Sequence, residues 1–304
     1  MKVLIAGASG FIGKALCEEL CGDYEIIALS RDVRRTASTL GEFAKVIEWD
    51  GRTTGTWVKF ADGAYAIINL AGEPIASGKW THSKKAGILH SRLDTTRAIV
   101  SGIKQLKNIP SVVIQASAIG YYGPRGDEEL TEKSPSGKGF LAEVCKGVEL
   151  CTEPLPGLGV RLVVIRTGVV LGKTGGALPR IAKPFKYFLG GHPGSGKQWF
   201  SWIAIEDEIA AIKFLMENEK QQGAFNLTSP EPLRMKQFCR KLGRALKSPS
   251  WTFVPGFILR KVFGEMADEM ILSGQKVLPE KLLAAGFEFK YPEVEKALRT
   301  ILID

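Results

Sequence analysis

A glycine-rich turn between an apolar run and a helical pattern constrains the fold of this chain more than any other feature. The three segments around it read as a short buried strand, an amphipathic helix and a second strand: Lys2–Ala6, Gly10–Leu20 and Glu25–Leu29. Gly7, Gly10 and Gly13 fall where the first strand turns into the helix. At this spacing the first glycine allows a tight turn, the second lets the backbone approach a pyrophosphate, and the third lets the helix pack closely. The sequence therefore predicts a dinucleotide-binding βαβ unit.

The start of the predicted helix is the expected contact point for phosphate. A helix N-terminus offers backbone N–H donors and a partial positive charge to an anion. We predict that this turn contributes the following cofactor contacts: Gly7, Ser9, Gly10, Phe11, Ile12 and Gly13. The alternative is a glycine-rich turn that binds no ligand.

Alternation of apolar runs and helical patterns indicates the fold class. Further apolar runs occur at Val46–Ile47, Ala66–Leu70, Val112–Ile114 and Leu162–Ile165. Stretches with helical spacing, such as Ser91–Lys104 and Phe140–Leu150, separate them. This pattern predicts an α/β fold, a Rossmann-type doubly wound parallel sheet with right-handed crossovers.

After about residue 170 the pattern changes to Gly- and Pro-rich sequence followed by two helical stretches, Ile205–Glu217 and Met235–Leu246. We expect residues 1–170 to form a Rossmann domain to which some later segments can return. Residues 171–304 are expected to form a smaller α+β substrate or cap region, with a C-terminal helical domain from about residue 250.

The end of the second strand bears on the choice of dinucleotide. An NAD-binding fold places an acid there to accept from the ribose 2′-OH. Here the chain has Ser30 and Arg31, and a guanidinium is suited to a 2′-phosphate. The sequence therefore favours NADP. Asp32 keeps NAD open if the register differs by one or two residues, and Arg31 could also be an ordinary surface arginine.

Charge and composition limit the classes of partner. The 304 residues carry 41 Lys or Arg and 32 Asp or Glu, a net charge of +9, but these cations are scattered along the chain. No segment reaches about 18 uninterrupted apolar residues. Three dispersed histidines and five cysteines without a CxxC pair indicate neither a metal site nor a disulfide framework. We expect a cytoplasmic protein without nucleic-acid or membrane partners, and an oligomer is possible.

Motifs spread over nearly the whole chain resemble a known superfamily. They include the glycine turn, Asp50, Asn69-Leu70-Ala71-Gly72, Ser91-Arg92-Leu93, Ser117-Ala118-Ile119-Gly120-Tyr121-Tyr122-Gly123, Arg166-Thr167-Gly168 and Gly274-Gln275-Lys276-Val277-Leu278-Pro279. Together they resemble the extended short-chain dehydrogenases/reductases, in the atypical "epimerase family" branch with a short C-terminal helical domain. The resemblance implies NADP(H) as cofactor, with further contacts from Asp50, Leu70, Ala71, Gly72 and Arg92.

The catalytic pattern of that superfamily is missing. Its Tyr-x-x-x-Lys pair acts as acid and base at the substrate carbon while hydride moves to or from the nicotinamide. The corresponding helix here reads Phe140-Leu141-Ala142-Glu143-Val144-Cys145-Lys146 and has no tyrosine. The candidates that remain are Tyr121 and Tyr122, with Ser117 near the position of the usual Ser/Thr partner and Glu73 as a further possibility. Aromatic packing is the alternative for each tyrosine.

Two hypotheses follow. The first is an NADP(H)-dependent oxidoreductase or epimerase-like enzyme that acts on a small molecule, a carbonyl compound or a sugar derivative, between the Rossmann domain and the cap. The second is a non-enzymatic NADP(H)-sensing regulator, which the missing Tyr-x-x-x-Lys pair favours.

Overall fold

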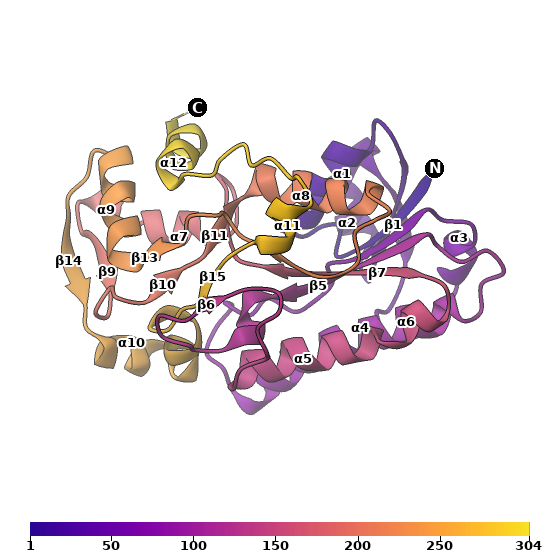
Figure 1. The fold of residues 1–304 in the computed structure, drawn as a ribbon, viewed down its shortest axis with the longest axis horizontal. Helices are drawn as coiled ribbons and strands as arrows, with labels where there is room; N and C mark the ends of the chain where they lie inside the picture. Colours follow the sequence, from indigo (N-terminus) through magenta and orange to yellow (C-terminus); the bar gives the residue numbers. More distant parts are fainter. Residues whose placement is uncertain (304) are drawn as a thin grey trace.

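A seven-stranded parallel sheet forms the centre of the computed structural model, which describes residues 1–303 (Figure 1). Its strands stand in the order β12-β7-β5-β4-β1-β2-β3, and every neighbouring pair is parallel. Their bounds are β1 Lys2–Ala6, β2 Glu25–Ser30, β3 Lys45–Glu48, β4 Ala66–Asn69, β5 Val112–Ala118, β7 Arg161–Thr167 and β12 Gly223–Leu227. The chain order reverses between β1 and β4, which is the switch point of a doubly wound sheet. The predicted fold class is confirmed.

Helices cover both faces of this sheet. On one face lie α1 (Phe11–Leu20) and α8 (Ile205–Glu217), and on the other α4 (His82–Ile103) and α5 (Phe140–Thr152). Shorter elements of this half are α2 Val33–Leu40, η1 Gly41–Phe43, α3 Val58–Ala61, η2 Ile119–Tyr122, β6 Glu129–Leu130 and α6 Pro154–Gly157.

Burial on both faces explains the continuous apolar runs of the strands. In β1, Val3 and Ile5 join the core under α1 and α8, whereas Leu4 joins the core under α4. Successive side chains of a strand point to opposite faces, so a strand that is covered on both sides is apolar over most of its length. The short central strands are recognisable in the sequence for this reason.

The chain returns to the sheet after the first 170 residues. Helix α8 packs against α1, and β12 pairs with β7 from Gly223 opposite Val163 to Leu227 opposite Thr167. Residues 205–227 therefore complete the central layer.

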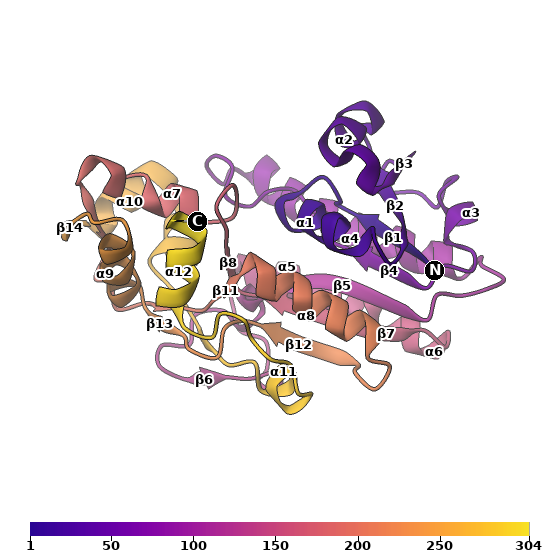
Figure 2. The ribbon, with the colours of Figure 1, turned by 90° about the horizontal axis from the view of Figure 1, so that it is seen from above.

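The remaining residues form a cap around Trp202, Phe185 and Phe238, all fully buried. Its elements are β8 Val169–Leu171, α7 Leu178–Ala182, η3 Phe185–Tyr187, β9 Gly190–Pro193, β10 Trp199–Phe200, β11 Trp202–Ala204, β13 Leu233–Arg234, α9 Met235–Ala245, β14 Ser250–Val254, α10 Gly256–Phe263, η4 Ala267–Ile271 and α12 Val294–Ile303. Two further elements return to the sheet half: β15 Lys276–Val277 pairs with β6, and α11 Glu280–Ala284 packs against β12. Both views place β14 at the end of the molecule farthest from β1–β3 (Figures 1 and 2).

Several elements extend beyond the predicted bounds, and α4 and β5 do so by the most residues. Helix α4 begins nine residues before the expected Ser91, because Thr81 caps it by accepting from the backbone N–H of Lys84 at 3.2 Å. Its first turns are polar, so they show no apolar stripe. Strand β5 continues to Ala118. No helix in residues 1–303 is long and apolar enough to cross a membrane, and no group of His, Cys, Asp or Glu in them could hold a metal ion.

Candidate functional site

The glycine turn has the geometry of a phosphate-binding loop. Gly7 has a φ of +81°, and a Cβ there would lie 2.7 Å from the carbonyl carbon of Leu70. A Cβ on Gly13 would lie 2.3 Å from the carbonyl oxygen of Gly7, so α1 packs directly on the turn. Gly10 is the N-cap of α1, and no side chain caps this helix. The first N–H groups of α1, at Phe11, Ile12 and Gly13, are therefore available to an anion.

A second glycine-rich segment lies against this helix start. A Cβ on Gly172 or Gly175 would come within 2.4 Å or 2.3 Å of the Phe11 ring, and one on Gly176 within 3.1 Å. The loop between β8 and α7 thus packs on Phe11 beside the open N–H groups. The contact joins residues about 160 positions apart, and the sequence analysis did not identify this loop as part of the site.

Ser30 at the end of β2 and the two residues after it have different roles. Asp32 is the N-cap of α2, and its Oδ1 accepts from the backbone N–H of Arg35 at 3.0 Å. The Ser30 hydroxyl lies 2.7 Å from that of Thr36 and accepts from the Asp32 N–H at 3.1 Å. Arg31 is exposed and forms no ion pair with any described residue. The acid that could have served a ribose is committed to its own helix, and the cation is free.

Asp50 follows β3, and Leu70 and Ala71 follow β4, so both loops lie at the carboxyl end of the parallel sheet. Asp50 accepts from the N–H groups of Arg52 and Thr53, at 2.8 and 2.9 Å. These bonds hold the pKa of its carboxyl below the usual value, so it stays ionised and shapes the loop. After β4, the Asn69 side chain accepts from the Ala71 N–H at 3.2 Å, which fixes the Leu70–Ala71 backbone against Gly7.

Arg92 of α4 places a partly desolvated positive charge beside the loop after β4. Its guanidinium carbon would lie 2.8 Å from a Cβ on Gly72, and its Nη1 donates to the carbonyl oxygens of Glu73 and Ile88. Burial lowers the pKa of the guanidinium. None of the described residues accepts a hydrogen bond from its Nε or Nη2. A desolvated cation with free donors fits an anionic or oxygen-rich ligand.

Of the four catalytic candidates, Glu73 forms an ion pair with Lys84 of α4, and Ser117 and Tyr122 belong to a polar network beneath α5. Ser117, Arg166 and Asn226 stand side by side on β5, β7 and β12 in register. The Ser117 hydroxyl donates to Glu149 at 2.8 Å, and Glu149 forms a 2.8 Å ion pair with Arg166. Although burial alone would lower it, the hydrogen bonds and charge of Glu149 raise the pKa of Arg166.

Tyr122 closes this network. Its ring is fully buried, and its hydroxyl donates to Asn226 at 2.6 Å and accepts from Arg166 at 3.0 Å. Burial raises the pKa of this phenol to about 12. A hydroxyl with both partners inside the protein has no free position for a substrate.

Tyr121 differs from its neighbour. It is partly exposed, and the guanidinium carbon of Arg166 lies 3.6 Å from its ring centroid. No described residue forms a hydrogen bond with its hydroxyl. Of the predicted catalytic residues, only Tyr121 therefore has a hydroxyl free to meet a ligand.

The face of α5 that meets η2 carries no acid or base. A Cβ on Gly120 would lie 3.2 Å from the Leu141 Cβ and 3.9 Å from the Cys145 sulfur. Leu141 and Cys145 are four residues apart, which is the spacing of a Tyr-x-x-x-Lys pair. Burial raises the pKa of the Cys145 thiol, so it is neutral. An apolar pair therefore occupies the helix face where the superfamily's acid and base would be expected.

Two buried carboxyls were missed by the sequence analysis, because nothing local distinguishes them from surface acids. Glu208 of α8 is fully buried, and its Oε1 accepts from the Thr167 hydroxyl at 2.8 Å. Burial raises the pKa of Glu208 to about 8. Glu132 accepts from the N–H of Asn226 at 3.0 Å, and burial raises its pKa as well. The second carboxyl oxygen of each has no hydrogen-bond partner among the described residues.

Comparisons with known proteins agree with this architecture. Residues 3–228 match the model of the NAD dependent epimerase/dehydratase family, and residues 254–301 match a domain of unknown function, DUF1731. The chain is 40% identical to the epimerase family protein SDR39U1 homolog, chloroplastic, of Arabidopsis thaliana, over 99% of this chain and 87% of that protein. It is 36% identical to the epimerase family protein YfhF of Bacillus subtilis, over 100% of this chain and 99% of that protein.

A solved structure is also similar over its full length. It is the human epimerase family protein SDR39U1, isoform 2, crystallised with NADPH, which has a TM-score of 0.90 and 31% identity over 100% of both chains. The resemblance inferred from the motifs is confirmed. This chain belongs to the NAD dependent epimerase/dehydratase family and carries the DUF1731 region at its C-terminal end.

Proposed function

We propose that this chain binds NADPH across the switch point between β1 and β4. The observation that carries the proposal is the division of roles after β2, where Asp32 caps α2 and Arg31 stays free for a 2′-phosphate. The uncapped start of α1 would hold the pyrophosphate. The NADPH in the similar human structure supports the same choice.

We further propose oxidoreductase or epimerase-like chemistry on a small carbonyl compound or sugar derivative. The compound would bind between the carboxyl ends of the strands and the cap. NADPH supplies a hydride when bound. Tyr121 would hold or release the proton at the substrate oxygen, since its hydroxyl forms no hydrogen bond with a described residue while those of Ser117 and Tyr122 do. Arg92 would stabilise negative charge on a ligand oxygen through its free Nε and Nη2.

One observation favours the second hypothesis, a non-enzymatic NADPH-sensing protein. Leu141 and Cys145 occupy the α5 face beside η2, and neither can transfer a proton at neutral pH. In that case the β8–α7 loop, which packs on Phe11, would be the element whose position reports cofactor occupancy.

A titration with NADPH and NADH tests cofactor binding. We expect NADPH to bind more tightly, and Arg31→Ala to weaken NADPH binding on the order of tenfold or more while NADH binding stays the same. Lys59→Ala, an exposed cation on α3, is the matched control and should leave both affinities unchanged. Binding of neither nucleotide, or equal binding of both, would refute the NADPH proposal.

Turnover separates the two functions. A panel of carbonyl compounds and nucleotide sugars is followed by NADPH oxidation. Under the enzyme hypothesis, Tyr121→Phe lowers kcat by about a hundredfold or more while the NADPH affinity is retained. An active Tyr121→Phe variant would remove Tyr121 from the mechanism. A cofactor-induced change in protease protection of residues 172–176 without turnover on any compound would support the sensing function.

A further inference from the structure

An uneven distribution of charge singles out residues 173–264, most of which belong to the cap. Residues 173–264 contain 15 Lys or Arg and 6 Asp or Glu, an excess equal to the whole net charge of +9. Between Pro232 and Gly264 there are eight Lys or Arg and no Asp or Glu. The positive field of the molecule therefore comes from this region, while the rest of the chain is balanced.

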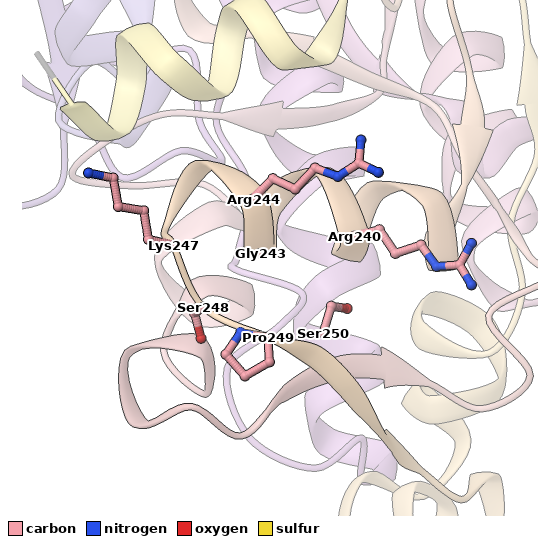
Figure 3. A pocket seen from close by; sticks show the side chains of 7 residues that line it. All are labelled: Arg240, Gly243, Arg244, Lys247, Ser248, Pro249 and Ser250. Carbon is pink, nitrogen blue, oxygen red and sulfur yellow. The ribbon is translucent and has the colours of Figure 1, made fainter.

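Helix α9 arranges part of this charge along one side. Lys236, Arg240 and Arg244 follow one another at i, i+4 spacing, and Lys247 comes directly after the helix. None of these four forms an ion pair with a described residue, whereas Lys241 pairs with Glu295. Figure 3 shows the side chains of Arg240, Arg244 and Lys247 extending in different directions from the hollow beside Ser248–Ser250. Such a spread suits many anionic groups on a surface better than one phosphate in a pocket.

The same end of the cap exposes large apolar side chains. Trp251 is 73% exposed and Phe257 is 69% exposed. We call this surface the cap tip. Its apolar members come from η3 and the following residues, from β14 and from α10: Tyr187, Phe188, Leu189, Trp251, Phe253, Val254, Phe257, Ile258 and Val262.

Hydrogen bonds hold the cap tip together. The Trp251 indole N–H donates to the carbonyl oxygen of Phe188 at 3.1 Å, and the Thr252 hydroxyl donates to that of Leu189 at 3.0 Å. Trp251 and Phe253 of β14 are both exposed, at the point where the pairing of this strand with β9 shifts register between Ser250 and Thr252. Strand β14 lies at the end of the molecule farthest from β1–β3 in both views (Figures 1 and 2).

We propose that the cap tip docks on the surface of an anionic lipid bilayer. Aromatic and aliphatic side chains would enter the boundary between headgroups and acyl chains, while the unpaired cations of α9, Lys247 and Lys261 of α10 meet the headgroup charges. Aliphatic residues such as Leu189 and Ile258 contribute to membrane insertion but not to base stacking, which favours a bilayer over a nucleic acid. A second copy of the chain is disfavoured, because the unpaired cations of two facing cap tips would repel one another. A peripheral contact of this kind requires no spanning helix, so the proposal departs from the sequence-based expectation of no membrane partner, which rested on the lack of a spanning segment.

Sedimentation with lipid vesicles tests the proposal on the full chain. We expect binding to vesicles of mixed phosphatidylglycerol and phosphatidylcholine, loss of binding to pure phosphatidylcholine, and weakening by salt. The double variant Arg244→Ala/Lys247→Ala should reduce the partition coefficient on the order of tenfold. Lys59→Ala/Lys104→Ala removes the same charge from exposed positions on the nucleotide-binding half and should leave it unchanged.

The apolar contribution is tested separately. Trp251→Ser/Phe253→Ser should reduce vesicle binding by a similar factor, and tryptophan emission of the unaltered protein should shift to shorter wavelength when vesicles are added. NADPH affinity is measured on every variant and should stay constant, which shows that the fold is intact.

Three outcomes would overturn the proposal. One is no binding to the anionic vesicles at low salt. Another is binding that neither double variant reduces more than the control. The third is a concentration-dependent dimer that Trp251→Ser/Phe253→Ser abolishes, since a second copy would then cover the cap tip. Tight binding of single-stranded RNA without vesicle binding would likewise replace the bilayer with a nucleic acid.

Discussion

The hydroxyl of Tyr122 donates a 2.6 Å hydrogen bond to Oδ1 of Asn226, and this bond ties the loop after β5 to the last strand of the sheet. The two residues are 104 positions apart in the chain. Because Arg166 donates to the same hydroxyl at 3.0 Å, the phenol connects a buried ion pair to a buried amide. This relationship assigns Tyr122 to the architecture beneath the cleft.

Replacing Tyr122 with phenylalanine should therefore affect stability before it affects chemistry. The change removes one buried hydrogen bond from Asn226 Oδ1 and one from Arg166 Nη1, which costs about 1–3 kcal/mol. Urea denaturation of Tyr122→Phe measures this loss, with Tyr121→Phe as the matched control because its hydroxyl has no hydrogen-bond partner among the described residues. A Tyr122→Phe variant as stable as the unaltered protein, but unable to oxidise NADPH, would assign Tyr122 to the reaction instead.

Asp32 gives a second test, in which stability and cofactor selectivity are expected to separate. Its carboxylate caps α2, so Asp32→Ala should lower the free energy of unfolding by about 1 kcal/mol. The preference for NADPH over NADH should stay as it is, because the carboxylate faces the Arg35 N–H. If Asp32→Ala selectively weakened NADH binding, the carboxylate would be shown to contact the ribose.

The sequence was sufficient to predict the features whose causes are local. The strands around Val3–Ile5 and Ile67–Ile68 are apolar throughout because both of their faces are buried, and Gly13 is required by a contact with Gly7, only six residues away. Strands and helices whose burial has a local cause show a regular pattern of apolar residues in the sequence.

Features that depend on long-range contacts could not be predicted. Nothing near Glu149 in the sequence shows that it will pair with Arg166, and Phe11 gives no sign of its contact with Gly172 and Gly175. The two-residue strands of the cap, such as Trp199–Phe200, are too short to have a periodicity. The role of Asp32 could not be predicted either, because it depends on α2 beginning directly after it. Helix ends are the least regular part of a helical pattern.

The glycine turn offers a contrast between two substitutions three residues apart. A Cβ on Gly13 would lie 2.3 Å from the Gly7 carbonyl oxygen, so Gly13→Ala should destabilise the fold by about 3 kcal/mol. Gly10 is exposed, and its Cβ would approach only the Gly7 oxygen, at 3.1 Å. Gly10→Ala should remain folded but bind NADPH at least about tenfold more weakly, because the methyl group stands where a pyrophosphate would approach. Thermal denaturation and NADPH titration of both variants check this, and a Gly10→Ala variant with full affinity would contradict the proposed pyrophosphate position.

Glu208 should make the stability of the protein depend on pH. Its pKa is raised by burial from 4.5 to about 8, so the folded state keeps a proton that the unfolded state releases between these values. The stabilisation from this group is therefore complete below pH 4.5 and is lost as the pH rises to about 8, at about 1.4 kcal/mol per pH unit.

Glu208→Gln keeps an acceptor for the Thr167 hydroxyl and cannot ionise, so the stability of this variant should fall less steeply over this range. Urea denaturation of both proteins at pH 5 and pH 8 gives the difference, which cancels the contributions of other acids such as Glu132 and Asp207. Equal slopes for the two proteins would show that Glu208 is ionised in the folded state.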